Sequence, residues 1–205
     1  MKITRIAPQM SNPERVNIFV DGEFYCGIDG FHLYGLGLRK GAELSEQQIK
    51  ALEEIREQEA VNSKAMSLLS YRDRSTFELK KRLLAEGFGA EAVKKCIGTL
   101  VKMGAVNDAA FVRRYAESAR GRYPRGKILA KLWEWGVPYS FSRPIVEEVC
   151  SPEEETEMAL ALARKKAASV KAASRYERRA ALYRYLTGKG FDGDTASAAV
   201  EEALG

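Results

Sequence analysis

The sequence predicts a mainly α-helical protein of three tandem three-helix repeats, preceded by a small N-terminal domain with a β-hairpin and a helix. Three observations lead to this fold class. Strand signals are confined to the first third of the 205 residues, an apolar i, i+4 pair ending in glycine recurs three times after residue 60, and an amphipathic pattern follows each glycine. Apolar residues make up 45% of the chain, enough for packed cores.

The strand signals lie in the segment VNIFVDGEFYCGI (16–28), which holds two β-prone runs around Asp21-Gly22. An Asp-Gly pair favours a two-residue type I′ turn, because both positions of that turn need a positive φ. Residues 3–6 (ITRI) offer a third strand, which a lone hairpin needs for stability. We therefore predict a small sheet at the N-terminus.

A helix is predicted over residues 44–55, because Ser45 and Gln48 have the spacing of a capping box. The preceding segment 30–41 carries the chain's single histidine, His32, and is interpreted as a non-helical turn. Its glycines are not followed by the third glycine or the lysine of a phosphate-binding loop. No Ser or Cys nucleophile motif accompanies His32, so we interpret it as a satisfied or solvent-facing side chain.

Each repeat contains the same helix ending. An apolar i, i+4 pair is followed four residues later by a glycine and then a hydrophobic residue, which is the pattern of a Schellman C-terminus. The first copy also begins with a capping box, Ser75 to Glu78. The three copies are Leu79 and Leu83 with Gly87-Phe88, Ile128 and Leu132 with Gly136-Val137, and Leu182 and Leu186 with Gly190-Phe191.

A further amphipathic helix follows each glycine, and another helix precedes each pair. The predicted apolar stripes of the last helices are Val93, Ile97 and Val101, then Phe141, Ile145 and Val149, then Ala196, Val200 and Leu204. The preceding helices include Ala65–Leu69, Phe111–Tyr115 and Met158–Ala168, the last with Ser151 as N-cap and Pro152 at its first position. The predicted domains are 1–60, 61–106, 107–150 and 151–205.

Composition argues against several classes of function. Cys26, Cys96 and Cys150 lie far apart, so we expect buried, reduced thiols and neither a metal nor another cofactor. The chain has no apolar run long enough for a membrane span and no secretory signal, so we expect it in the cytoplasm. A carboxylate–metal enzyme stays open on Asp21 and Glu23, but the hairpin alone explains Asp21, and we predict no enzymatic activity.

Basic residues are unevenly distributed along the chain. The whole sequence carries a net charge of +5, whereas residues 1–60 carry −3, residues 113–131 carry +6 and residues 164–189 carry +8. Such a distribution indicates an anionic partner for the C-terminal two-thirds, most simply nucleic acid. Arginine suits this contact because its planar guanidinium binds two phosphate oxygens at once.

Three tyrosines, Tyr176, Tyr183 and Tyr185, are interleaved with the arginines of residues 174–186. Tyrosine can stack on an unpaired nucleic-acid base, but burial of these side chains in the core is the favoured interpretation. An alternative is a stand-alone helix-turn-helix DNA-binding protein or transcription regulator. However, the basic residues are spread over consecutive repeats, which favours a long polyanion or filament as the partner. The predicted DNA- or filament-binding residues are Arg72, Arg113, Arg114, Arg120, Arg122, Arg125, Lys127, Lys131, Arg164, Lys165, Lys166, Arg175, Arg178, Arg179 and Arg184.

Segments 65–88 and 100–120 resemble the signature of the RecX family, bacterial regulators of the RecA recombinase. The resemblance is good over residues 60–150 and looser in the third repeat, while residues 1–60 resemble the N-terminal extension of longer members. The matching residues are Leu69-Ser70, Arg72, Ser75, Glu78-Leu79, Leu83, Gly87-Phe88, Leu100, Gly104, Asn107-Asp108, Phe111, Gly126-Lys127-Ile128, Leu132 and Gly136-Val137.

The resemblance implies tandem three-helix repeats in an elongated, curved molecule. It also implies a function in DNA repair, recombination and the SOS response. The chain would lodge in the groove of the RecA–DNA filament and modulate, with inhibition expected, the ATPase, strand-exchange and coprotease activities of RecA. The implied partners are RecA and single- and double-stranded DNA, without a membrane, a catalytic residue or a cofactor, and the chain is expected to be a monomer.

Overall fold

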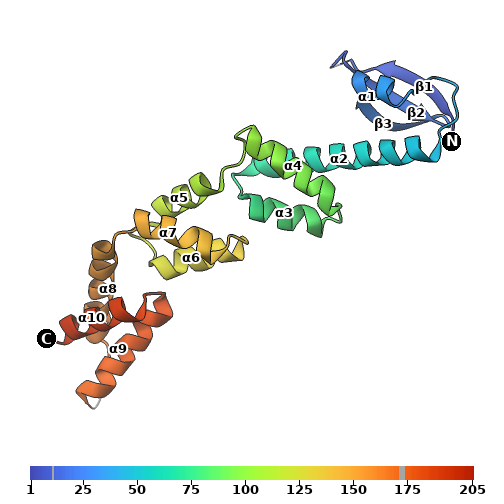
Figure 1. Cartoon of the computed structure of the whole chain (residues 1–205). Helices are drawn as coiled ribbons and strands as arrows, with labels where there is room; N and C mark the ends of the chain where they lie inside the picture. Colours follow the sequence, from blue (N-terminus) through green and yellow to red (C-terminus); the bar gives the residue numbers. More distant parts are fainter. Residues whose placement is uncertain (11, 171–173) are drawn as a thin grey trace. The chain divides into compact units, whose positions relative to one another are not determined.

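The structure is a computed structural model that describes residues 1–10, 12–170 and 174–205 (Figure 1). Within these residues a three-stranded sheet precedes a series of helices, as the sequence predicts. Contacts divide the chain into two compact units, one of Met1–Arg72 with Arg82–Lys102 and the other of Asp73–Lys81 with Met103–Gly205. The division falls inside helix α3 (Thr76–Ala85).

The sheet is antiparallel, with strands β1 (Ile3–Pro8), β2 (Arg15–Val20) and β3 (Glu23–Asp29) in that order. The predicted hairpin and third strand are both confirmed. Asp21 and Gly22 have φ angles of 50° and 94°, the positive values that a type I′ turn requires. One face of the sheet is buried in a core that includes Ile3, Ile18, Ile28 and Leu52.

Segment 30–41 differs from its prediction, because residues Gly30–Gly35 form a short helix, α1. The backbone turns after it at Leu36 and Gly37. Leu33 and Leu36 pack against the core of the sheet, and this burial outweighs the weak helix propensity of the glycines at both ends of α1. His32 is exposed on α1, in agreement with a solvent-facing side chain.

Helix α2 (Glu46–Tyr71) is continuous, and it joins the helix predicted over residues 44–55 to the one predicted at Ala65–Leu69. The predicted capping box is present, with Ser45 and Gln48 exchanging hydrogen bonds. No glycine or proline interrupts the next 26 residues, so the helix continues through residue 60. Its start buries Leu52 under the sheet, and its second half supplies the first helix of the first three-helix domain.

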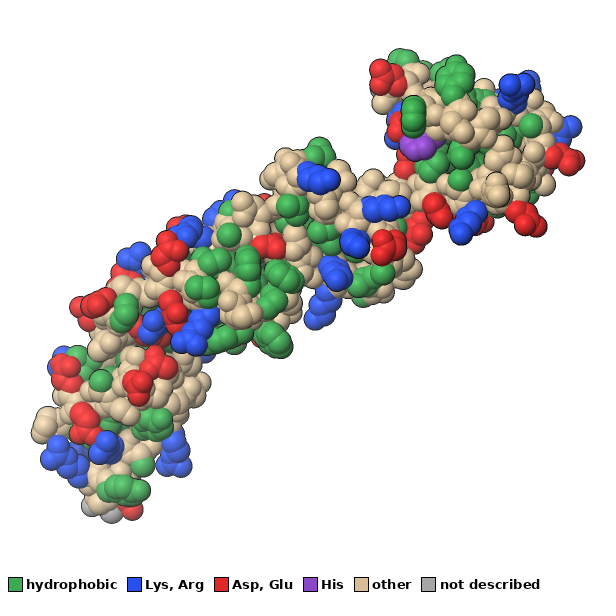
Figure 2. Space-filling view, in the orientation of Figure 1, with side chains coloured by type: hydrophobic (Ala, Val, Ile, Leu, Met, Phe, Trp, Pro, Cys, Tyr) green, Lys and Arg blue, Asp and Glu red, His purple; other side chains and the backbone are tan. Residues whose placement is uncertain are grey.

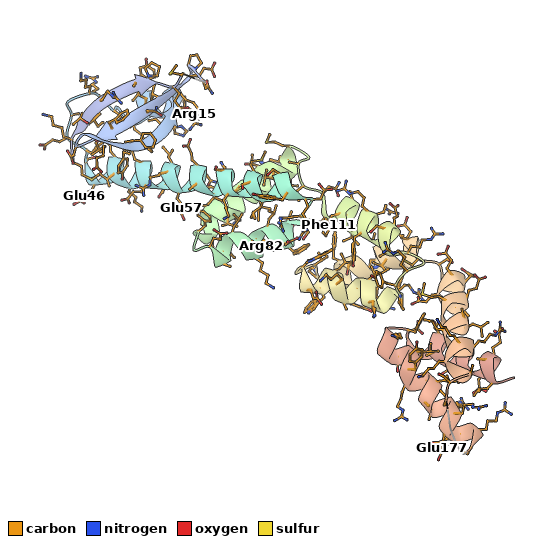
Figure 3. The ribbon with its side chains drawn as sticks, turned by 180° about the vertical axis from the view of Figure 1, so that it is seen from behind. Arg15, Glu46, Glu57, Arg82, Phe111 and Glu177 are labelled. Carbon is orange, nitrogen blue, oxygen red and sulfur yellow. The ribbon has the colours of Figure 1, made fainter. Side chains whose placement is uncertain are left out.

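Helix α4 (Ala90–Lys102) completes the first three-helix domain and packs against α2. Glu57 of α2 (Figure 3) accepts a hydrogen bond from the Gly89 backbone at 2.7 Å, and so satisfies an amide at the start of α4. The predicted apolar stripe of α4 is partly wrong, since Val101 is 47% exposed. Cys96 and Leu100 are buried with Val93 instead, which turns the apolar face by about one residue.

The second three-helix domain consists of α5 (Asp108–Ala119), α6 (Arg125–Glu134) and α7 (Tyr139–Val149). Its core includes the predicted Ile128 and Leu132, while Phe141 and Ile145 are only partly buried against it. Phe111 of α5 (Figure 3) packs edge-to-face on Trp135, with ring centroids 5.7 Å apart.

The third domain consists of α8 (Pro152–Ala167), α9 (Arg175–Lys189) and α10 (Gly193–Leu204). The predicted N-cap of α8 is confirmed, because Ser151 Oγ accepts a hydrogen bond from the Glu154 backbone at 3.2 Å. Leu182 and Leu186 of α9 are fully buried against alanines of α8 and α10. These small residues allow the helices to approach closely.

All three predicted helix endings are Schellman motifs with the same pair of hydrogen bonds. The three glycines have φ angles of 89°, 84° and 103°, and a residue with a Cβ atom would be strained at these values. The bonds are Gly87 to Leu84 and Phe88 to Leu83, Gly136 to Trp133 and Val137 to Leu132, and Gly190 to Thr187 and Phe191 to Leu186. The three repeats are therefore built alike at the ends of their middle helices.

Acidic residues at the starts of α5 and α8 link each of these domains to a preceding helix of the second unit. The Asp108 carboxylate accepts hydrogen bonds from the backbone nitrogen and the hydroxyl of Thr76, both at 2.6 Å. In the same way, Glu155 accepts a hydrogen bond from the Arg125 backbone at 3.0 Å. A carboxylate from the following repeat thus satisfies the free amides at the starts of α3 and α6.

Glycines make a second contact at the joint between α6 and the third domain. A Cβ atom on Gly126 would overlap the backbone carbonyl oxygen of Gly190. Gly190 also lies close to Lys127, whose backbone nitrogen would be 3.1 Å from a Cβ atom on Gly190. The two backbones can approach this closely only because both positions are glycine.

Candidate nucleic-acid interface

Seven of the fifteen predicted binding residues form ion pairs within the chain. Arg113 donates two hydrogen bonds to Glu148, at 3.0 and 2.8 Å, and so uses its fork on a carboxylate. The hydrogen bonds and charge of Glu148 raise the pKa of Arg113, and those of Arg113 lower the pKa of Glu148. Arg120 binds Glu154 of α8 in the same bidentate way, with Nε 2.8 Å from Oε2.

Arg125 is the most enclosed of these paired residues. Its side chain forms an ion pair with Glu155, of which only 4% is exposed, and lies 3.7 Å from Asp192. A buried carboxylate needs a counter-charge, because desolvation penalises the ionised form. Arg125 therefore has a structural role at the joint between the second and third domains.

The other four paired residues are more exposed. Their partners come from the same helix or from a segment distant in sequence. The pairs are Arg114 with Asp73 at 2.7 Å, Lys131 with Glu134 at 2.6 Å, Arg164 with Glu202 at 3.3 Å and Arg179 with Glu201 at 2.7 Å. Exposed pairs of this kind stabilise a fold little and exchange readily with other anions.

Seven further predicted residues have no acidic side-chain partner in the part of the chain that the structure describes. Arg72 is the C-cap residue of α2 and completes the predicted set. Lys171, Ala172 and Ala173, which belong to the +8 segment, lie outside the described residues. The seven residues are Arg122, Lys127, Lys165, Lys166, Arg175, Arg178 and Arg184.

The charge counted over each predicted domain differs from the charge counted over the short basic segments. Residues 61–106 hold nine basic and four acidic residues, residues 107–150 hold eight and five, and residues 151–205 hold nine and nine. The first three-helix domain is therefore the most basic, although only Arg72 of it is in the predicted set. A count over each predicted domain would have found the missed exposed lysines. They are Lys80, Lys81, Lys94, Lys95 and Lys102.

The third domain has no net charge, but its acidic and basic residues lie in different places. The first turn of α8 carries Glu153, Glu154 and Glu155, and its last turn carries Arg164, Lys165 and Lys166, which also matches the helix dipole. Figure 2 shows the blue side chains of this domain gathered around the end of α8 and the start of α9. The C-terminal end of α8 and helix α9 thus form one basic surface.

The tyrosines of α9 contradict the predicted burial in two of three cases. Tyr176 is 80% exposed and Tyr183 is 38% exposed, while Tyr185 packs partly against the core. The buried leucines occupy one side of α9, and Tyr176 and Tyr183 fall away from it by about a quarter turn. Lys166 and Lys189 lie 5.5 and 5.3 Å from the centre of the Tyr185 ring, as cation–π contacts.

The remaining candidate chemical groups have structural explanations. Burial raises the pKa of Cys26 to about 11 and also raises the pKa values of Cys96 and Cys150, so these buried thiols stay protonated near neutral pH. Asp21 Oδ1 accepts a hydrogen bond from the Lys2 backbone at 2.9 Å, which ties the hairpin turn to β1. Among the described helices, none is long and apolar enough to span a membrane.

Family models match three segments of the chain. The model described as the regulatory protein RecX N-terminal domain matches residues 1–45, that of the first three-helix domain of RecX matches residues 63–100, and that of the third matches residues 153–200. The third repeat, where the motif resemblance is loosest, is therefore matched by a family model of its own.

Curated relatives match nearly the whole chain. A protein named Regulatory protein RecX from Bacillus licheniformis is 30% identical and covers 98% of this chain and 76% of its own length. One of the same name from Clostridioides difficile is 29% identical, with coverages of 98% and 95%.

Solved structures of the same name share the fold. A crystal structure of regulatory protein RecX superposes with a TM-score of 0.72 at 24% identity and covers 98% of both chains. RecX from Lactobacillus salivarius gives a TM-score of 0.63 at 18% identity and covers 72% of this chain and 96% of its own. The curated relatives and the family models show that the chain belongs to the RecX family of regulatory proteins.

Proposed function

We propose that this chain regulates RecA by binding the RecA–DNA filament as a monomer and lowering the ATPase, strand-exchange and coprotease activities of RecA. The observation that carries the proposal is the match of the whole chain to proteins named Regulatory protein RecX. Family membership supports regulation of RecA, and the exposed cations support contact with a polyanion. In this proposal the chain acts by occupying the filament and performs no chemistry of its own.

The structure supports a specific division of the predicted binding residues. Arg113, Arg120 and Arg125 already have bidentate or buried carboxylate partners, so moving them to a phosphate would cost these contacts. Among the described residues, the seven cations without an acidic partner and the five exposed lysines that the sequence prediction missed have no such contact to lose. We therefore assign filament contact chiefly to Arg122, Lys127, Lys165, Lys166, Arg175, Arg178 and Arg184, together with Lys80, Lys81, Lys94, Lys95 and Lys102.

Many weak charge contacts on consecutive domains suit a repeating partner. Each domain could contact a different section of the filament, and linked contacts raise the overall affinity without any single strong site. Charge attraction would also speed the encounter with the DNA-containing filament, and the rate should fall as salt increases.

The direct test follows DNA-dependent ATP hydrolysis by RecA on preformed filaments while the full chain is added. We expect hydrolysis to fall at near-stoichiometric amounts of the chain, and unchanged hydrolysis would overturn the proposal. Excess competing DNA serves as the control, since a protein that merely covers free DNA would be titrated away by it. Binding to one DNA sequence far above bulk DNA at matched salt would instead support the stand-alone DNA-binding alternative.

A further inference from the structure

We propose that the groove between α9 and α10 binds unpaired bases of single-stranded nucleic acid, with Tyr176 and Tyr183 as stacking surfaces. The proposal deepens the proposed function and rests on it for the biological source of the strand, the DNA of the filament. The sequence alone favours burial of these tyrosines, but in the structure Tyr176 is 80% exposed and Tyr183 is 38% exposed.

The groove has a volume of about 250 Å³ and lies within the third domain. Ala180 and the almost fully buried Val200 line it with apolar atoms, and Ser197 adds a hydroxyl on the α10 side. An exposed ring beside an apolar groove can cover one face of a base while the groove receives its edge. Stacking of this kind tolerates any base sequence, because every base has a π face.

The spacing of the two rings favours a single strand over a duplex. Tyr176 and Tyr183 are seven residues apart, so they lie on the same side of α9 and about 10 Å apart along its axis. Stacked bases in a duplex repeat every ~3.4 Å and expose only their edges. Two rings so far apart can stack only on bases that have been separated from one another.

Charges around the groove fit a phosphate backbone that follows α9. The helix carries five basic residues and one acidic residue, and Arg175, Arg179 and Arg184 flank the tyrosines. Within the described part of the chain, Arg175 makes a 3.5 Å contact to the Gly205 carbonyl oxygen and has no acidic side-chain partner. Arg179 is paired with Glu201 in an exposed contact that a phosphate could replace.

The α10 side of the groove is acidic, with Glu201 and Glu202 near its end. These carboxylates would repel phosphates, so the backbone of a bound strand should run along the α9 side while its bases point towards α10. A protein partner could also use exposed tyrosine and arginine. The excess of basic residues along α9 favours the nucleic acid.

The test uses the full chain and a fluorescent oligothymidylate, with a duplex of matched length as comparison. Changing both Tyr176→Ala and Tyr183→Ala should weaken binding to the single strand roughly tenfold or more and change duplex binding little. The double Tyr→Phe variant keeps both rings and should bind like the unchanged chain. Tyr71→Ala is the matched control, because Tyr71 is 81% exposed but lies at the end of α2.

Photocrosslinking to an oligonucleotide with 5-iodouracil gives an independent readout, and we expect the crosslinked peptide to contain Tyr176 or Tyr183. Equal loss of single-strand and duplex binding, or no loss of either, would overturn the proposal. Loss of RecA inhibition without loss of oligonucleotide binding would also overturn it and mark the groove as a protein-binding surface. RecA inhibition by the unchanged chain tests the proposed function separately, so the two failures are distinguishable.

Discussion

The second and third three-helix domains use their arginines in opposite ways. In the second domain, the guanidinium groups of Arg113 and Arg120 bind carboxylates of other helices. Arg125 neutralises a carboxylate that is almost fully buried. In the third domain, Arg178 and Arg184 of α9 project from an exposed face. The two basic segments look alike in sequence. They differ because bidentate or buried carboxylates bind three arginines of the second domain, whereas the ion pairs of Arg164 and Arg179 in the third domain are exposed.

This difference separates stability from binding. An arginine that compensates a buried carboxylate contributes to the free energy of unfolding and is a poor ligand for another anion. An exposed arginine contributes little to stability and is available to a phosphate. Variants of the two classes should therefore have opposite effects, and each of the following predictions tests one part of that contrast.

The largest effect on stability is expected for Arg125→Ala. Removing the guanidinium leaves Glu155 charged and buried, which should lower the free energy of unfolding by about 3–5 kcal/mol. Urea denaturation followed by circular dichroism measures the change. Arg122→Ala, an exposed neighbour, is the control and should change stability by less than about 0.5 kcal/mol. Equal effects of the two substitutions would refute the structural role of Arg125.

The glycines of the joint should give the next largest effects. In Gly126→Ala the new methyl group overlaps the carbonyl oxygen of Gly190, so the third domain must shift at a cost of about 2–3 kcal/mol. Gly87→Ala adds a methyl group in open space, so it should cost only the strain of a positive φ, about 1 kcal/mol. Denaturation curves of both variants provide the comparison. A loss for Gly87→Ala as large as that for Gly126→Ala would argue against close backbone contact at the joint.

The smallest effect concerns Asp192, the N-cap of α10. Burial raises its pKa, but hydrogen bonds from Thr195 and the charge of Arg125 outweigh this effect, so the pKa lies below its usual value. Its stabilisation is therefore complete above the unfolded pKa of about 3.9 and is lost as pH falls through the lower folded pKa. Asp192→Ala should cost about 1 kcal/mol at pH 7.

Stability measured from pH 7 down to acid pH checks the sign of this effect. The curves of the unchanged chain and of Asp192→Ala should converge as the carboxylate is protonated. A difference that stays constant over this range would show that the charge of Asp192 is not what stabilises α10.

Local features of the fold were predictable from the sequence because neighbouring residues determine them. The Asp21-Gly22 hairpin, the Ser45–Gln48 capping box and the three glycine endings all depend on a few adjacent residues. The length of α2 was not predicted, because a long helix serving two domains has no signal at the boundary between them. The stripe of α4 was misjudged because a helix with many small or apolar residues allows two similar faces.

The candidate interface was less predictable for a physical reason. Arg113 and Glu148 are 35 residues apart, and Arg120 and Glu154 are 34 apart, so no local window contains both charges of either pair. The +6 of residues 113–131 therefore overstated the exposed charge. Tyr176 and Tyr183 were assigned to the core by residue type, although their positions on α9 relative to Leu182 and Leu186 indicate an exposed side.

The most direct test compares two double variants. One loses two exposed arginines of α9, and the other loses the two bidentately paired arginines of the second domain. We expect Arg178→Ala and Arg184→Ala together to reduce the slope of log affinity for single-stranded DNA against log salt by about 1.4, since each phosphate contact contributes ~0.7. Arg113→Ala and Arg120→Ala together should leave the slope nearly unchanged, because these charges are already neutralised within the chain. Equal reductions in the two variants, or a larger one in the second, would contradict the division between paired and exposed arginines.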